Sequence, residues 1–475
     1  MKKFIFIPVL CVYLAGINNS VNAQDYKNYN LNSYYTPDIV RNYLVFNGSL
    51  SQESDFRQYQ STTTINGNFN SSYYYLVNTR KKICELSSGL SLSGGGNTMK
   101  RFYEKIISKN NSFSNGDFIN IRYMIYNNSN YFLSTDTHIN YYYDSNSNNN
   151  TDSLLRRDYS SFSQHNILGG LSVGIGKGRV EHITDAVQTV YLIEALQNKG
   201  LLKKDFDDND IFDLSQKIST IKNKRFLDSR QKLIEEITKV DSFIVSNNKI
   251  NKQDAAYFTT LYDIWLNGAN FERKTGRIIE LKIQPNIYFK NQFTTNVSQI
   301  NNQNDYTEQY KISDRNYRLG IYYLNEKSIN YKWQKSFNAQ AEAAISNNYQ
   351  LTDKSTSTKT TNESLYKTAN SNVSYRLGYY PNTRTNIYGQ LSNRTDLNYY
   401  SQINNNNSET ISTAKDVYNI SEIAIGTYYY FSPNLRLSAN ATVRNYFNIY
   451  DITANISANN RFTNNLTLSI TYLVF

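Results

Sequence analysis

Apolar and polar residues alternate one by one along most of this chain. The clearest segments are 119–125, 281–290, 337–346, 373–379 and 435–444. Successive side chains of a β-strand point to opposite faces, so a sustained period of two predicts strands with one apolar and one polar face. A transmembrane β-barrel needs such strands, because its outer face meets lipid and its inner face meets water. A soluble β-sandwich alternates too, but the roughly ten- to twenty-residue strands repeated here favour the barrel.

The composition agrees with a barrel better than with the other classes. The chain has 43 Tyr and 23 Phe but only 5 Pro, and its mean hydropathy is −0.60. No apolar run of about twenty residues exists, which excludes a helical membrane protein. Disordered chains are poor in aromatic residues, which argues against disorder. A barrel looks hydrophilic on average because only alternate residues face lipid.

The first residues have the pattern of a secretory signal peptide. Two lysines precede a short apolar run, and small residues end at Ala23, so we expect 1–23 to be removed and the mature chain to start near Gln24. Cys11 would leave with this segment, and Cys84 alone cannot form an intramolecular disulfide. We therefore expect export by the general secretory pathway to the outer membrane of a diderm, Gram-negative bacterium.

The formal net charge of +11 suggests contact with an anionic partner in the compartment to which the protein is exported. Nucleic acid is not expected in that compartment. Anionic lipid headgroups of the outer membrane, or a cation-lined lumen, explain the charge better.

We expect about fourteen strands (12–16), after a short polar lead-in at 24–42. About six form a first part of the barrel within 24–176, and about eight form a second part within 276–475. The predicted strands are 43–52, 61–77, 82–95, 117–127, 131–144, 159–176, 277–294, 309–323, 329–350, 367–380, 383–402, 416–431, 434–448 and a terminal strand. Residues 450–460 also alternate and 461–465 resemble a turn, which would make the count odd, whereas such barrels normally have even strand numbers.

The connections between these strands are of two kinds. Some are short, such as 127–130 and 432–434. Others are long and polar: 96–116, 145–158, 296–308, 351–366 and 402–415. Outer-membrane barrels have short periplasmic turns and long outer loops, so this alternation predicts the same arrangement.

The chain ends in Leu466–Phe475, where Leu466, Leu468, Ile470, Tyr472 and Val474 fall on one face. This segment resembles the terminal strand of outer-membrane proteins. The resemblance implies recognition by the barrel assembly machinery during insertion, although Phe475 is out of phase with the apolar face.

Residues 177–275 interrupt the β-pattern with a helical insert of about three helices. The first is expected at Thr184–Asn198, a second long helix opens in the acidic run Asp205–Asp213 and continues to about residue 244, and a third spans 252–272. The glycines of Gly174–Arg179 lack the P-loop pattern and are interpreted as a flexible joint. Six preceding strands place the insert in the periplasm, or folded into the lumen as a plug. Its two ends should lie one interstrand spacing apart, roughly 5 Å.

A basic stretch lies on the predicted long helix and is either a solvated face or a surface for a periplasmic or envelope protein. Its residues are Lys222, Lys224, Arg225, Arg230 and Lys232.

Four motifs of the insert carry a family resemblance: Gly178–Glu181, Thr184–Ala186, Gly200–Leu202 and Lys224–Arg230. They resemble a segment of uncharacterised outer-membrane β-barrel proteins of the Bacteroidota type that carry a helical insert. The resemblance implies location and architecture, and it transfers no catalytic residue.

Enzymatic chemistry is not indicated. His138, His165 and His182 are scattered, and with serine so common a Ser–His pairing by chance carries little weight. One thiol and three separate histidines make no metal cluster. We predict no enzyme activity, no metal and no cofactor.

Charged residues on the polar faces of the strands are the better functional candidates. Lumen charges tune the selectivity of barrels, but they can also pair with one another and merely fill the interior. The candidates are Arg122, Lys282, Glu342, Arg376, Glu422, Arg436 and Arg444.

Two functions remain open. The chain is a porin-like channel gated or plugged by its helical insert, or it is a non-transport barrel for envelope assembly, secretion or anchoring whose insert docks a periplasmic partner. Eight-stranded barrels are filled and sixteen-stranded ones hold a channel, so about fourteen strands leave both readings open.

Overall fold

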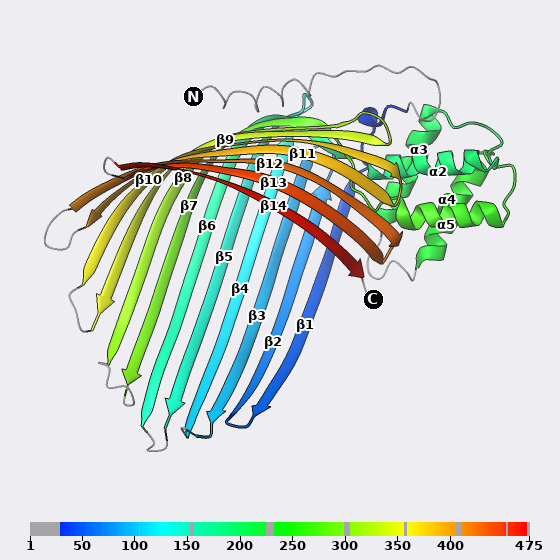
Figure 1. The fold of residues 1–475 in the computed structure, drawn as a ribbon. Helices are drawn as coiled ribbons and strands as arrows, with labels where there is room; N and C mark the ends of the chain where they lie inside the picture. Colours follow the sequence, from blue (N-terminus) through cyan, green and yellow to red (C-terminus); the bar gives the residue numbers. More distant parts are fainter. Residues whose placement is uncertain are drawn as a thin grey trace.

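Fourteen antiparallel strands follow one another in chain order to form a single curved sheet (Figure 1). The computed structural model describes residues 29–103, 105–152, 156–224, 232–298, 305–355, 359–404, 410–452 and 455–472. The strands are β1 (Ile39–Arg57), β2 (Gln60–Asn78), β3 (Lys82–Arg101), β4 (Ile106–Tyr126), β5 (Tyr131–Thr151), β6 (Arg157–His182), β7 (Lys274–Ser298), β8 (Tyr306–Ser328), β9 (Trp333–Lys354), β10 (Thr360–Asn382), β11 (Thr385–Asn404), β12 (Thr410–Ser432), β13 (Leu435–Ile452) and β14 (Asn455–Tyr472). The predicted antiparallel sheet of about fourteen strands is confirmed. Six strands precede the insert and eight follow it.

The strands are longer than the alternation predicted. The ladder between β5 and β6, for example, continues to the pair Thr151 and Arg157. The expected long loops are therefore wrong, because their Asn- and Ser-rich residues extend the strands. Outside a membrane a strand needs no apolar face, so the alternation fades before the strand ends. The expected turn at 461–465 is also wrong: it lies inside β14, and 450–460 is divided between β13 and β14.

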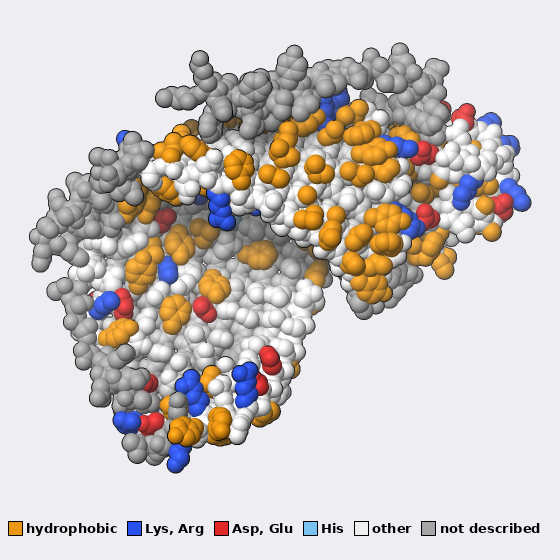
Figure 2. All heavy atoms as spheres, viewed as in Figure 1, with side chains coloured by type: hydrophobic (Ala, Val, Ile, Leu, Met, Phe, Trp, Pro, Cys, Tyr) orange, Lys and Arg blue, Asp and Glu red, His pale blue; other side chains and the backbone are white. Residues whose placement is uncertain are grey.

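The sheet has an apolar outer face and a polar inner face. On β6, Ile167, Leu171, Val173 and Ile175 are exposed, whereas Ser172 between them is buried. Nine residues at about 3.3 Å per residue, tilted by about 40°, give a band roughly 23 Å tall, close to the height that a bilayer requires. Figure 2 shows apolar side chains gathered over β11–β14, in the half of the sheet nearer the helices.

The described residues of the insert form four helices, at one end of the sheet (Figure 1): α2 (Thr184–Asn198), α3 (Asp208–Asn223), α4 (Leu233–Ser246) and α5 (Ala255–Asn267). The predicted single long helix is wrong, because α3 ends at Asn223 and α4 begins at Leu233. One helix over 206–244 would be almost 60 Å long at about 1.5 Å per residue. Two shorter helices bury both apolar stripes in one core. None of the helices in the described ranges is long and apolar enough to cross a membrane.

The segment before β1 belongs to the core of the insert. Tyr29, Leu31 and Tyr34 are buried among residues of α2 and α3, with Leu31 on the short helix η2 (Leu31–Ser33). Tyr34 is only 1% exposed, and its ring meets Phe212 edge-on at 5.8 Å. The expected polar lead-in is therefore wrong. These three residues follow neither a helical nor a strand period. The sequence pattern therefore could not show that the segment is packed rather than a polar tail.

The ends of the insert lie side by side, as predicted. β6 and β7 pair antiparallel up to His182 and Lys274, and the Ile183 amide then donates to the Arg273 carbonyl at 2.9 Å. The expected flexible joint at Gly174–Arg179 is wrong, because these residues are part of β6. Gly178 has a φ of +102°, and a Cβ there would lie 2.0 Å from the Arg277 carbonyl oxygen, so close strand approach explains this glycine.

Candidate functional site

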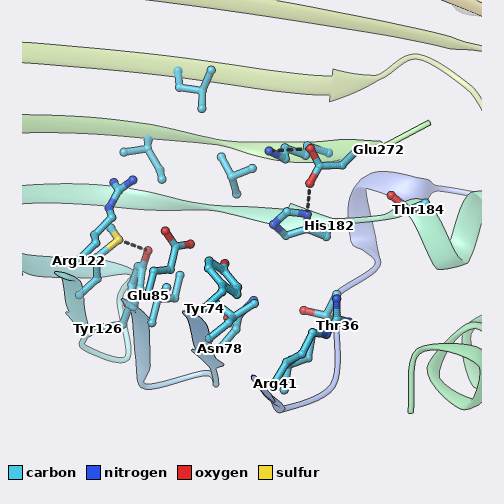
Figure 3. Close-up of a pocket in the computed structure, with 18 of the residues that line it drawn as sticks. Thr36, Arg41, Tyr74, Asn78, Glu85, Arg122, Tyr126, His182, Thr184 and Glu272 are labelled. Atoms are coloured by element: carbon cyan, nitrogen blue, oxygen red, sulfur yellow. Dashed lines mark hydrogen bonds and ion pairs between the residues drawn. The ribbon is translucent and has the colours of Figure 1, made fainter. Parts of the chain in front are cut away.

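A large cavity separates the helical insert from the inner face of the sheet, and we call it the vestibule. Its volume is about 1170 Å³, and residues of β1–β4, β6–β9, α2 and α3 line it (Figure 3). The vestibule therefore connects the polar inner face of the barrel with the insert. It exists because β6 and β7 carry the helices past the strand ends instead of closing in a short turn.

Four charged residues form a cluster at the barrel wall of the vestibule: three of them line this cavity, and Asp136 lines an adjoining one. Lys282 Nζ lies 2.5 Å from Asp136 Oδ2 and 3.4 Å from Glu280 Oε2. Arg122 approaches the same two carboxylates at 3.6 and 3.9 Å. Glu280 is only 3% exposed, and the Ser134 hydroxyl also donates to it. Two cations and two anions neutralise one another here, so the cluster shapes the wall without adding net charge.

The insert side of the vestibule carries its own ion pairs. Lys222 Nζ lies 2.6 Å from Asp185 Oδ1, between α3 and α2. His182 Nδ1 lies 2.9 Å from Glu272 Oε1, and Lys274 Nζ lies 3.1 Å from Oε2 (Figure 3). The hydrogen bond from His182, together with Lys274, lowers the pKa of Glu272 to about 2. Glu272 is thus a carboxylate at neutral pH, and it joins the two strands at the base of the insert.

Hydrogen bonds attach the insert to the turns at the same end of the sheet. The Tyr191 hydroxyl on α2 donates to the Tyr380 carbonyl at 2.7 Å. Tyr331, in the β8–β9 turn, donates to Glu194 at 2.9 Å and packs in the helical core. Arg384, in the β10–β11 turn, pairs with Asp263 on α5. These contacts attach the insert to the strand turns at this end of the sheet.

Arg273 is the most deeply buried attachment point, at 1% exposure. It donates to Gln334 Oε1 at 2.6 Å and to the Tyr331 carbonyl at 2.8 Å, and it stacks 4.1 Å from the centre of the Tyr380 ring. Burial lowers the pKa of Arg273. Its polar partners are mostly backbone carbonyls, so sequence periodicity gave no signal for it.

The seven predicted lumen residues have different partners and line different cavities. Arg122 and Lys282 meet in the vestibule cluster. Glu422 and Arg444 are direct cross-strand partners and form an ion pair. Glu342 accepts from the Tyr322 hydroxyl and from Asn370. Arg376 and Arg436 line a second cavity, bordered by β7–β13 and by the residues that follow α5.

Sequence reasoning missed Asp136 and Glu280, the acidic half of the vestibule cluster. Both occupy inward positions, and Asp136 pairs directly with Arg122 across β4 and β5. The alternation of β7 places Glu280 two residues before Lys282, on the same face. Extending the period of two by one residue would have found Glu280. For Asp136 the signal was weak, because threonines occupy the outward positions beside it.

The predicted basic stretch of the insert does not form one helix face. Lys222 is only 11% exposed on its side chain, pairs with Asp185 and lies over Trp265. Lys224 follows α3 as its C-cap and Lys232 precedes α4 as its N-cap. Arg225 and Arg230 lie outside the described residues.

The histidines are separated from one another. His165 contacts the Tyr141 hydroxyl at 3.0 Å, His182 contacts Glu272, and His138 borders small inner cavities. Within the described ranges, no group of three or more His, Cys, Asp or Glu side chains is placed to hold a metal ion. Cys84 on β3 is a free thiol.

The strand order, the antiparallel register and the apolar outer face define the class of this protein, a β-barrel of the outer-membrane type. No protein-family model and no curated protein matches the chain.

Solved structures of barrels resemble it distantly. The transport unit of the autotransporter AIDA-I from Escherichia coli is 10% identical, with 83% of this chain and 90% of that chain covered and a TM-score of 0.24. The beta domain of the Bordetella autotransporter BrkA is 9% identical, with 74% and 91% covered and a TM-score of 0.20. At such scores these likenesses carry no argument, and the class rests on the chain's own geometry.

Proposed function

We propose that this protein is an outer-membrane channel for small polar solutes and that its helical insert covers the periplasmic mouth. The vestibule carries this proposal: a cavity of about 1170 Å³ lies between a polar inner wall and an insert attached outside the lumen. The inner face along the strands is largely half-buried, as expected for a wall that borders water. The insert shares the end of the sheet where β1 begins and β14 ends, and we assign this end to the periplasm because an even number of strands brings both chain ends to one side.

Conductance in planar lipid bilayers tests this proposal. Because Ile183 and Arg273 are hydrogen-bonded, residues 184–272 can be replaced by an Asn-Gly turn that keeps the β6–β7 hairpin. We expect steady conductance from the full chain and a several-fold rise after the replacement. The matched control replaces Gln58–Tyr59, the β1–β2 turn at the opposite end, with the same dipeptide. No conductance from either the full chain or the uncovered variant would refute the channel.

The second candidate is a barrel whose insert docks a periplasmic protein. Large apolar side chains exposed on the insert favour it: Ile234 on α4 is 82% exposed, and Phe258 and Tyr262 on α5 are 44% and 47% exposed. A photo-crosslinking residue at Phe258 should then join one protein of defined mass in cells. The control position is Lys203, between α2 and α3. The same products from both positions would remove the basis for docking.

A further inference from the structure

A second inner cavity, next to the vestibule, carries an unused set of hydrogen-bond donors. We call it the arginine pocket. Its volume is about 360 Å³, and its lining includes Arg376, Arg436, Asn386, Tyr380, Tyr430 and Phe271. Glu272 and Lys274 border both cavities, so the pocket opens beside the vestibule.

The two arginines of this pocket stack on tyrosines and have no carboxylate partner among the described residues. The Arg376 guanidinium lies 4.0 Å from the centre of the Tyr388 ring, and that of Arg436 lies 5.2 Å from Tyr428. Other inner-face arginines differ. Arg394, for example, has Asp396 at 2.9 Å. Stacking orients a guanidinium and leaves its N–H groups free for a ligand.

The carboxylates that border the arginine pocket are already engaged. Glu326 accepts from the Gln334 amide at 3.0 Å and from the Ser336 hydroxyl at 2.7 Å. Glu272 is held by His182 and Lys274. The pocket therefore offers cationic donors without a free acid to neutralise them.

Two buried donors in the same pocket have no hydrogen-bond partner among the residues that the structure describes. Asn386 is 2% exposed, and its amide nitrogen makes no hydrogen bond. The Nε atom of Arg436 is likewise buried without an acceptor. Unsatisfied buried donors cost free energy, and two of them at one cavity indicate that a ligand supplies the acceptor.

One wall of the pocket is aromatic. The Phe271 ring lies 5.7 Å from Tyr380 and 5.5 Å from Tyr430, centre to centre. Guanidinium groups bind the planar carboxylate through paired N–H donors, and an aromatic wall favours an apolar body. A cavity near 360 Å³ admits only a small molecule.

We propose that the arginine pocket binds a small carboxylate with an aromatic body. The assignment deepens the proposed channel function, on which it rests for access through the lumen, because it names the class of solute that pauses there. The carboxylate lies between Arg376 and Arg436 and accepts from Asn386. The ring lies against Phe271.

Calorimetric titration of the full chain in detergent micelles, with benzoate as the probe, tests the pocket. We expect Arg376→Gln and Arg436→Gln each to raise Kd by about tenfold, since each removes hydrogen bonds to a charged group. Neutral benzamide lacks the carboxylate, so its Kd for the wild-type protein should be at least as high as the Kd of benzoate for those two variants. The matched control is Arg394→Gln, which removes a lumen arginine paired with Asp396 and should leave Kd unchanged. Heat-modifiable migration in electrophoresis verifies that each variant is folded.

Inorganic phosphate forms the second arm of the experiment. Tighter binding of phosphate than of benzoate, unaffected by Phe271→Ala, would overturn the aromatic carboxylate. Wild-type affinity in both arginine variants, or no binding of benzoate to the wild type, would overturn the pocket itself. Bilayer recordings separate this inference from the proposed function: binding without conductance refutes the channel alone, and conductance without binding refutes the pocket alone.

Discussion

Strands β1 and β14 are the two edges of the sheet, and we expect them to pair with each other when the protein is in a membrane. About half of the backbone donors and acceptors of residues 462–472 point away from β13, which leaves roughly ten groups on this edge without a partner. In hydrocarbon each unsatisfied group costs several kcal/mol, so closure is worth on the order of tens of kcal/mol.

The side chains determine which residues should face one another. β1 begins and β14 ends at the insert end, so the pair is antiparallel. Phe462, Leu466, Leu468 and Tyr472 are exposed on β14, as are Val40, Leu44, Phe46 and Leu50 on β1. One register matches every one of these residues with another: Tyr472 with Val40, Leu468 with Leu44, Leu466 with Phe46, and Phe462 with Leu50.

Disulfide formation in outer-membrane vesicles tests that register. In a Cys84→Ala background, Leu44→Cys with Leu468→Cys should oxidise readily, because facing Cβ atoms lie about 4.5–5.5 Å apart, near the distance that a disulfide spans. Mass spectrometry after trypsin digestion then detects a covalent link between the two terminal strands.

Two control pairs make the result decisive. Leu44→Cys with Asn464→Cys is displaced by four residues, roughly 13 Å along the strand. Val45→Cys with Leu468→Cys places the thiols on opposite faces. Absence of the bond in the matched pair, or equal yields in the controls, would refute closure in this register.

Three further predictions concern the insert and its junction. The pKa of Glu272 is lowered from 4.5 to about 2 in the folded protein, so its contribution to stability is present above pH 4.5 and is lost as pH falls towards 2. Thermal unfolding of the full chain, followed by helical circular dichroism, should show this loss, and Glu272→Gln should reduce the dependence of stability on pH. Tyr34→Ala empties a fully buried site and should lower the free energy of unfolding of the insert by about 3–5 kcal/mol, measured in urea, whereas an unchanged midpoint would contradict the packing of this segment. Gly276→Ala places a Cβ 2.0 Å from the Arg179 carbonyl oxygen at a φ of +116°, so it should reduce the folded, heat-modifiable form; a normal yield would show that the strands can separate there.

Local pattern was sufficient for the sheet because the period of two is a property of neighbouring residues. The alternation in the sequence already assigns Ile119 and Arg122 to opposite faces of β4. In the structure Ile119 is exposed on the apolar face and Arg122 lies on the polar face. The strand ends were not readable in the same way. Residues such as Asn146–Asn150 extend β5 by backbone pairing, to which their side chains contribute no periodic signal.

The insert shows the opposite balance. Its helices could be located from their caps and apolar stripes, yet the break between α3 and α4 and the burial of Tyr34 depend on contacts with distant segments. Arg273 could not be recognised at all, because most of its partners are backbone carbonyls at the β8–β9 turn. An apolar stripe on a helix indicates that this face is buried, but it does not indicate which segment packs against it.

By itself the sequence determined that the strands have one apolar and one polar face, that there are about fourteen of them, and that the two ends of the insert meet. Only the tertiary structure decided how the lumen charges are used. Arg444 pairs with Glu422, Arg122 belongs to the four-charge cluster, and Arg376 and Arg436 have no carboxylate partner in the part of the chain that the structure describes. The physical reason is that alternation along a strand encodes only the face on which a residue lies. The partner of that residue depends on the register between strands and on the position of the insert, and a local sequence period encodes neither the register nor that position.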